Sequence, residues 1–204
     1  MDFNFTEEQQ MLCDSVGRFL QNDYDFDARQ KLVRSDAPWS PEVWQQLAEF
    51  GLLALPFGEE QGGLGGSITD CVAIAELFGK HLMIEPYTAA IMLAGAALAT
   101  SSDAAVRSLL ETLIAGEAVV AFAYEEGHGT PASELVTLVA QTGGAGYTLS
   151  GEKRLVVAGA HAQALVVVAR KGEGGPLALF LVEGGSEGLE ARAYATIDGR
   201  SAAN

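Results

Sequence analysis

Apolar residues recur at helical spacing over the first 116 positions of the chain. Thr6 and Gln9 have the spacing of a capping box, and Val16 and Leu20 follow on one helical face. This pattern predicts a first helix that ends near Gln21. The segment "DFDARQKLV" allows a second helix directly after it.

Two further helices carry clear start and stop residues. In "SPEVWQQLAEFG", Ser40 is the expected N-cap, Pro41 takes the first helical position and Gly51 ends the helix. The segment "ITDCVAIAELFGK" is apolar on most of its sides, so it predicts a buried helix that ends at Gly79.

The helical region closes with two more segments. "EPYTAAIMLAGAALAT" is opened by Pro86, and "SDAAVRSLLETLIAG" is capped by Ser102 or Asp103 and stopped by Gly116. The first part of the chain is therefore predicted to be all helical.

The stretch "EEQGGLGGSITD", residues 59–70, could form either a phosphate cradle or a plain connector between helices. A dinucleotide fingerprint requires G-x-G-x-x-G after a strand, and a P-loop requires a lysine after its last glycine. The spacing G-G-L-G-G follows a helical segment and has no such lysine. The connector is the favoured interpretation.

The hydrophobic period changes at Gly116, where short segments rich in Val, Leu and aromatic residues begin, separated by Gly or Pro. No helical pattern lies between them to make parallel crossovers, so we expect an antiparallel sandwich or small barrel. The predicted fold class is α+β, with an all-α domain over 1–116 and a β domain over 117–204. The segments are "EAVVAFAYEE", "ELVTLVAQT", "AGYTLSGEKRLVVAG", "AQALVVVARK", "PLALFLVEG" and "LEARAYAT".

Charge and composition exclude several functional classes. The net charge is −15, and 12 basic residues are scattered among 27 acidic ones. Nucleic acid requires clustered Lys and Arg, so it is excluded as a partner, and an anionic membrane surface is disfavoured. An anionic cofactor could still bind at a local basic site or a helix terminus.

Cysteines and histidines give no sign of a metal site or a nucleophile. Cys13 and Cys71 lie in separate helical segments and are expected to be buried thiols. His81, His128 and His161 are far apart in the sequence, and each is expected to be solvated. We therefore expect no metal.

Segments that target or span membranes are not expected either. The start "MDFNFTEEQQ" lacks an apolar signal core, and "AAIMLAGAALA" has 11 residues where a membrane span needs about 20. These features predict a cytoplasmic protein.

Several motifs, in their order and spacing, resemble the acyl-CoA dehydrogenase family. They are the opening "MDFNFTEEQQMLCDSVGRFL", the segment "WQQLAEFGLLALPFGEEQGGLGG", the entry "AGEAVVAFAYEE" into the β region, and "GYTLSGEKRLVVAGAHAQALVVVAR" with its G-x-K. Gly58 stands where many members have Pro. The segments "EPYTAAIML" and "ATIDGRSAAN" are most similar to the small subunits of pimeloyl-CoA-type, two-subunit enzymes.

The resemblance implies FAD as the cofactor, bound between the β domain and a C-terminal helical bundle that this chain lacks. It places flavin contacts at Phe122, Tyr124 and Glu125, where the family reads A-x-T-E-P, and at Leu155 and Val157, where it reads W-[IS]-T. An aliphatic side chain cannot replace the threonine hydroxyl, and a missing donor in a buried site costs about 1–3 kcal/mol. The other interpretation of Tyr124, Leu155 and Val157 is packing within the β core.

The resemblance also implies the activity, which is α,β-desaturation of a CoA thioester, with a bulky or dicarboxylic acyl chain and a role in fatty acid or steroid side-chain degradation. The family's glutamate base lies beyond Asn204, so this chain carries no catalytic residue and is expected to be inactive alone. Two alternatives are a non-catalytic partner subunit and a flavin oxygenase with the same fold.

The implied partners are an acyl-CoA substrate, an electron-transfer flavoprotein as electron acceptor, and further dehydrogenase subunits in a homo- or hetero-oligomer. The helical segments 68–78 and 87–99 carry one charge, Glu76, within their apolar stretches, so they need to be buried. We expect an interface formed by residues 68–99 and the exposed side of the β domain.

Overall fold

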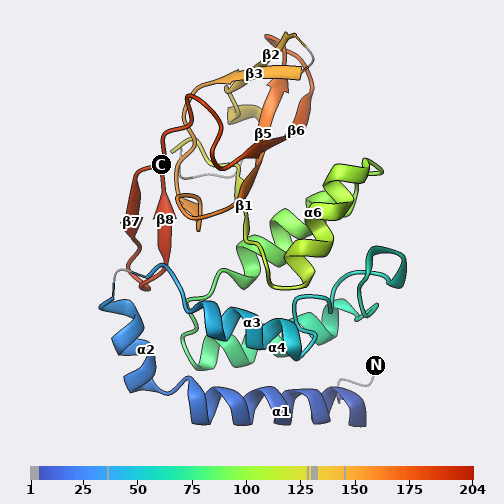
Figure 1. The fold of residues 1–204 in the computed structure, drawn as a ribbon, viewed down its shortest axis with the longest axis vertical. Helices are drawn as coiled ribbons and strands as arrows, with labels where there is room; N and C mark the ends of the chain where they lie inside the picture. The colour runs from blue at the N-terminus through green and yellow to red at the C-terminus, as the bar shows by residue number, and fades with distance from the viewer. Residues whose placement is uncertain (1–4, 36, 128, 130–132, 145) are drawn as a thin grey trace.

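The computed structural model describes residues 1–204 except for 1–4, 36, 128, 130–132 and 145. A helical half is followed by a β half, as the change of hydrophobic period predicts, and Figure 1 shows the β half standing on the helical half. The α+β fold class is therefore confirmed.

The first three helices begin at the residues that the sequence pattern indicates. The Gln9 amide donates to Thr6 Oγ1 at 3.2 Å and the Thr6 amide to Gln9 Oε1 at 2.9 Å, which completes the capping box. The Ser40 hydroxyl likewise accepts from the Val43 amide at 3.2 Å. These helices are α1 (Glu7–Asp23), α2 (Phe26–Val33) and α3 (Pro41–Glu49).

The later helical segments depart from the prediction at one place. Residues Thr88–Gly95 (η2) form a π-helix instead of an α-helix, and only Ala96–Leu98 (α5) continue it in the α form. The other two are regular: α4 (Ile68–Lys80) runs one residue past Gly79, and α6 (Ala104–Ile114) is capped by Asp103. Two short 3-10 turns are η1 (Glu59–Gln61) and η3 (Ser133–Leu135).

The glycine-rich stretch is a tightly folded connector. The Gly65 amide donates to the Phe57 carbonyl at 2.7 Å, and the Gly66 amide donates to the Leu55 carbonyl at 2.8 Å. A Cβ atom added at Gly63 would lie 2.0 Å from the Phe57 carbonyl oxygen. Because two of its amides bind the chain's own carbonyls, the stretch does not form a phosphate cradle, as the sequence spacing indicates.

The β half contains two sheets. One has five strands, in which β5 pairs on one side with β1 and β2 and on the other with β6, while β3 extends from β2. Its strands are β1 (Val120–Ala123), β2 (Val139–Gly143), β3 (Gly146–Ser150), β5 (Ala164–Lys171) and β6 (Leu177–Glu183). The smaller sheet has the order β4 (Val156–Val157), β8 (Ser201–Ala203) and β7 (Ala193–Ala195).

Two pairings in the larger sheet are parallel, which corrects the expectation of a purely antiparallel domain. β1 and β2 both run parallel to β5, with Val120 opposite Ala164 and Val139 opposite Arg170. Between β1 and β5 the chain passes through β2, β3 and β4, so it can return in the same direction without a crossover helix. The β2–β3, β5–β6 and smaller-sheet pairings are antiparallel, as expected.

One hydrophobic core joins the two halves. Val119 and Val120 of the β1 region and Val166 of β5 pack in the same cluster as Ile91 of η2 and Leu113 of α6. A second, smaller core lies within the β half. The two halves are thus held together by buried apolar side chains, and β1 is anchored on the helical half.

Candidate functional site

Two segments that are 29 residues apart in sequence run side by side at the end of β1. The Arg154 amide donates to the Glu125 carbonyl at 2.8 Å, and the Lys153 ammonium donates to the Tyr124 carbonyl at 3.0 Å. These bonds bring Tyr124 and Glu125 beside the segment that contains Leu155 and Val157, so four of the five predicted flavin contacts lie on two adjoining segments. We call residues 124–125 and 154–157 the β1–β4 strip.

Backbone strain occurs at both ends of β4 within and beside this strip. Leu155 has φ +53° and Ala158 has φ +62°, in the left-handed region that residues with a side chain rarely adopt. The Leu155 side chain is 53% exposed, and its amide donates to Asn204 Oδ1 at 3.1 Å. Strained residues cluster at binding and active sites, so the strip is a candidate site.

Phe122, which lies outside the strip, and Val157, which lies within it, also take part in the framework of the fold. Phe122 is half-buried and packs against the core that joins the two halves. Val157 is half-buried and pairs with Ala202 of β8, and its neighbour Val156 is buried. Core packing therefore accounts for much of the environment of Phe122 and Val157, while Leu155 remains open to solvent.

A buried ion pair supports the strip from below. Lys153 Nζ lies 2.7 Å from Glu126 Oε1, and each side chain is only 7% exposed. Burial alone would raise the pKa of Glu126, but hydrogen bonds from Lys153, Thr137 and Leu138 lower it to about 2. Glu126 is therefore ionised at neutral pH.

Sequence reasoning did not assign this pair. Lys153 is the lysine of the G-x-K segment, and no motif around Glu126 marks it as the partner of this lysine. A lysine and a glutamate 27 residues apart carry no local signal of pairing, and the pair forms only when the two segments meet.

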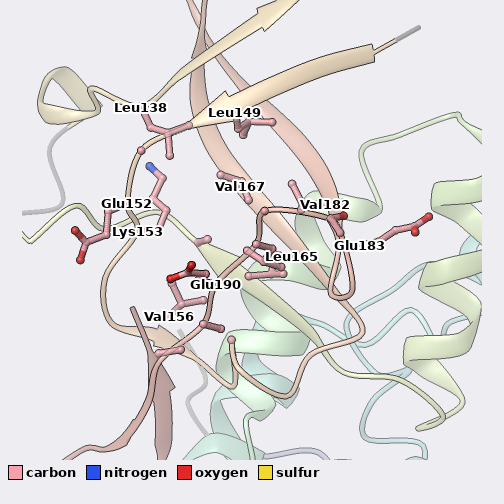
Figure 2. Close-up of a pocket in the computed structure, with 18 of the residues that line it drawn as sticks. Leu138, Leu149, Glu152, Lys153, Val156, Leu165, Val167, Val182, Glu183 and Glu190 are labelled. Atoms are coloured by element: carbon pink, nitrogen blue, oxygen red, sulfur yellow. The ribbon is translucent and has the colours of Figure 1, made fainter. Parts of the chain in front are cut away.

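A cleft of about 940 Å³ opens on the same side of the β half (Figure 2). Its lining includes Leu165 and Val167 of β5 together with Lys153, the residue before the second segment of the strip. Its rim is mainly acidic, because Arg192 is outnumbered there by carboxylates. This rim disfavours the phosphates of FAD or CoA. The acidic lining residues are Glu152, Glu183, Glu187 and Glu190.

The aliphatic side chains of residues 155–157 suit the apolar face of a flavin ring better than its polar edge. Leu155, Val156 and Val157 supply no hydroxyl group where the family has threonine. Among the described residues, the buried side-chain atoms without a hydrogen-bond partner are Trp44 Nε1 and Glu85 Oε2, and both lie in the helical half. Residues 155–157 therefore offer apolar side chains without a hydrogen-bond donor, while Tyr124 and Arg154 are the donors within the strip.

Part of the predicted motif lies outside the described residues. His128 and residues 130–132, which follow Glu126 where the family reads G-S-D, belong to this part. His81 caps the end of α4, and His161 lies in the β half with its ring edge-on to Trp39.

Family models match both halves of the chain. The model of the acyl-CoA dehydrogenase N-terminal domain matches residues 6–117, and the model of the middle domain matches residues 121–204. The chain belongs to the acyl-CoA dehydrogenase family.

Similar proteins include the acyl-CoA dehydrogenase FadE27 of Mycobacterium tuberculosis, which is 29% identical over 96% of this chain and 51% of its own length. Benzylmalonyl-CoA dehydrogenase of Aromatoleum aromaticum is 27% identical over 90% of this chain and 49% of its own length. The ChsE4-ChsE5 complex from Mycobacterium tuberculosis contains a chain with a TM-score of 0.87 and 26% identity, covering 100% of this chain and 54% of that chain. This chain thus spans about half the length of these relatives.

Within the part of the chain that the structure describes, no helix has both the length and the apolar character needed to cross a membrane.

Proposed function

We propose that this chain forms the N-terminal and middle domains of a flavin-dependent acyl-CoA dehydrogenase that desaturates a CoA thioester at its α and β carbons. The observation that carries the proposal is the β1–β4 strip, in which Tyr124 and Glu125 lie beside Leu155 in the fold of this family. A bound flavin would supply the hydride acceptor. This chain would position the flavin and the acyl group and exclude water from them, since it offers no residue in the role of the base.

FAD is the proposed cofactor, with contacts from Phe122, Tyr124, Glu125, Leu155 and Val157. Family membership supports the flavin, and the exposed Leu155 supports an apolar contact with the ring face. Because residues 155–157 carry no hydroxyl group, hydrogen bonds to the polar ring edge come from backbone amides, from another side chain such as Tyr124, or from another chain.

The proposed substrate is an acyl-CoA with a bulky or dicarboxylic acyl chain. One similar protein is named for benzylmalonyl-CoA, which is both bulky and dicarboxylic. The proposed electron acceptor is an electron-transfer flavoprotein.

A second chain completes this proposal. Ile68 and Val72 of α4 and Leu93 of η2 are exposed apolar residues in the range 68–99, where burial is expected. The similar ChsE4-ChsE5 structure is a complex of two named chains. We propose a homo- or hetero-oligomer in which this surface of the helical half is covered.

The second candidate function is a non-catalytic partner subunit that stabilises an active sister chain. It is favoured by the aliphatic side chains at residues 155–157, which cannot make the flavin hydrogen bond of the family. Both candidates share the proposed division at residues 116 and 117, supported by the end of α6 at Ile114 and the start of β1 at Val120. A cytoplasmic location is also proposed, and cell fractionation tests it.

The flavin absorbance spectrum separates the two functions. The protein is purified alone and together with a dehydrogenase subunit encoded by a neighbouring gene. Bound flavin is measured near 450 nm, where oxidised flavins absorb, and a full site corresponds to on the order of one flavin per chain. Flavin bound to the chain alone, or only to the complex, supports the enzyme interpretation. A complex whose flavin is unaffected by changes in this chain supports the partner subunit.

Matched variants locate the site. Val157→Thr returns the hydroxyl at the position of the family's threonine and is expected to tighten flavin binding by about tenfold, a typical gain for one added hydrogen bond. Val182→Thr on β6 makes the same change at another half-buried strand position outside the strip, and it is expected to have no effect. Equal effects of the two variants contradict the placement.

A further inference from the structure

Three chain segments converge on the carboxylate of Glu126. Its Oε2 atom accepts from the Thr137 amide at 2.8 Å and from the Thr137 hydroxyl at 2.6 Å. Its Oε1 atom accepts from the Leu138 amide at 3.1 Å and from Lys153 Nζ at 2.7 Å. The carboxylate thus joins the end of β1 to the start of β2 and to the segment before β4.

Lys153 makes the second half of this junction. Its ammonium group donates both to Glu126 and to the Tyr124 carbonyl, so it binds the β1 segment at two points. The pair is also far more buried than Arg154–Glu152, an ion pair in the same segment whose side chains are more than half exposed.

Stability alone is a weak reason to bury such a pair. Removing two charges from water is costly, and replacing a buried ion pair with apolar residues is often neutral or favourable. Unlike apolar residues, the ion pair fixes the distance and the direction between specific atoms of the two segments. Among the atoms fixed here, the Tyr124 carbonyl belongs to the β1–β4 strip, and Glu126 and Lys153 directly adjoin its two segments in sequence.

The strip contains a residue that needs such support. Leu155 follows directly after Lys153 and Arg154, and its φ of +53° is unfavourable for a residue with a branched side chain. A strained conformation persists only where its surroundings hold it in place. The Arg154 amide bond to Glu125 and the Lys153 bond to Tyr124 lie immediately before it.

We propose that Glu126 and Lys153 are positioning residues, which lock residues 124–125 against 154–155 and so fix the surface that the flavin ring meets. This inference rests on the proposed function for its purpose, although the lock itself is a property of this chain. It assigns a role to two residues that do not themselves touch the ring.

Hydrogen–deuterium exchange tests the lock without any flavin. The variants Glu126→Gln and Lys153→Met remove one partner each, and the double variant removes both charges. Glu152→Gln is the matched control, because it breaks the exposed pair in the same segment. We expect amides of residues 124–126, 137–138 and 153–155 to exchange about tenfold faster or more in the single variants. Exchange in β6 is expected to stay unchanged in all of them.

The affinity for FAD tests whether the lock supports flavin binding. Titration of FAD, followed by flavin fluorescence, is expected to show about tenfold weaker binding or more for Lys153→Met and wild-type affinity for Glu152→Gln. Lys153→Arg, which keeps the charge and the donors, is expected to recover part of the affinity. Both measurements use the protein with its partner where the wild type requires it.

The outcomes are distinct. Unchanged exchange in the three segments, or equal acceleration throughout the β half, overturns the lock. Local acceleration with unchanged FAD affinity overturns the positioning role. A wild-type protein that binds no flavin in any combination contradicts the proposed function, while the exchange measurement still decides whether the lock exists. If Glu126→Gln does not fold, Lys153→Arg and the double variant carry the same comparison.

Discussion

Glu85 is the most deeply buried charged residue among the described residues, with 2% of its surface exposed. Its Oε1 atom accepts from the Ser40 amide at 3.3 Å, and its Oε2 atom has no hydrogen-bond partner. Burial therefore raises the pKa of the Glu85 carboxyl above its ordinary value of 4.5, although hydrogen bonds, including those to Tyr24 and Ser40, oppose the shift.

The direction of this pKa shift fixes how stability depends on pH. The folded state holds the Glu85 proton more tightly than the unfolded state does, so its contribution is fully present below about pH 4.5 and is lost as pH rises through the folded pKa. Glu85→Gln keeps the shape without the charge. We expect its free energy of unfolding in urea to exceed that of the wild type by about 1 kcal/mol or more at pH 7.

At pH 4 the wild type is protonated at Glu85, and the difference is expected to shrink to within about 0.5 kcal/mol. Glu111→Gln, an exposed position on α6, serves as the control and is expected to change little at either pH. A Glu85→Gln variant that is equally destabilised at pH 4 and pH 7 would show that another group stabilises the Glu85 carboxylate in the folded state.

At the scale of single elements, the connector between α3 and α4 depends on close backbone approach. The carbonyl oxygens of Leu55 and Phe57 accept hydrogen bonds from the amides of Gly66 and Gly65. The connector is thereby folded onto the end of α3 and sets where α4 begins.

Gly63→Ala is expected to destabilise the protein strongly, by about 3 kcal/mol, because its methyl group would overlap the Phe57 carbonyl and force the backbone apart. Gly17→Ala is the matched control. It lies within α1 with no atom close to the added methyl group, so it is expected to stabilise by about 0.5–1 kcal/mol. Thermal unfolding followed by circular dichroism compares the two. Equal midpoints would contradict the close approach at Gly63.

At the scale of the whole molecule, the helical half has two kinds of apolar surface. Ala90, Ile91 and Ala94 of η2 are buried, and η2 packs against β1. In contrast, Val72 of α4 is 60% exposed. The second kind of surface is where association is expected.

Sedimentation velocity at micromolar concentration is expected to show an oligomer, either of this chain alone or with its partner. Val72→Lys is expected to weaken this association by about tenfold or more, because a charge would be buried at the interface. Met11→Lys on α1, an equally exposed position outside 68–99, is expected to leave it unchanged. A folded, soluble monomer both alone and with the partner would contradict the interface.

Residues 1–204 by themselves are expected not to dehydrogenate an acyl-CoA, because no residue in them matches the family's glutamate base. The assay follows reduction of an artificial electron acceptor in the presence of FAD and a range of CoA esters. A sample with the sister chain added is the positive control. Turnover by residues 1–204 alone would refute the expectation and would direct attention to Glu125 and Glu126.

The sequence by itself determined the features that depend on neighbouring residues. The caps at Thr6, Ser40 and Asp103 each need a side chain within about one helical turn, and the hydrophobic period separates helices from strands over about ten residues. The glycine connector was also predictable, since neither phosphate motif fits its spacing. Family resemblance singles out Tyr124, Glu125 and Leu155 as flavin contacts, which stays a prediction, and the structure brings their two segments side by side.

Only the tertiary structure decided the features that depend on distant residues. The Glu126–Lys153 pair and the parallel pairings with β5 join segments tens of residues apart, and no local pattern encodes such a meeting. β8 was not predicted, because Ser201, Ala202 and Ala203 have no strand preference of their own and form a strand by pairing with β4 and β7. The preference for helix or strand depends on a few adjacent side chains, whereas strand pairing and burial depend on the path of the whole chain in space.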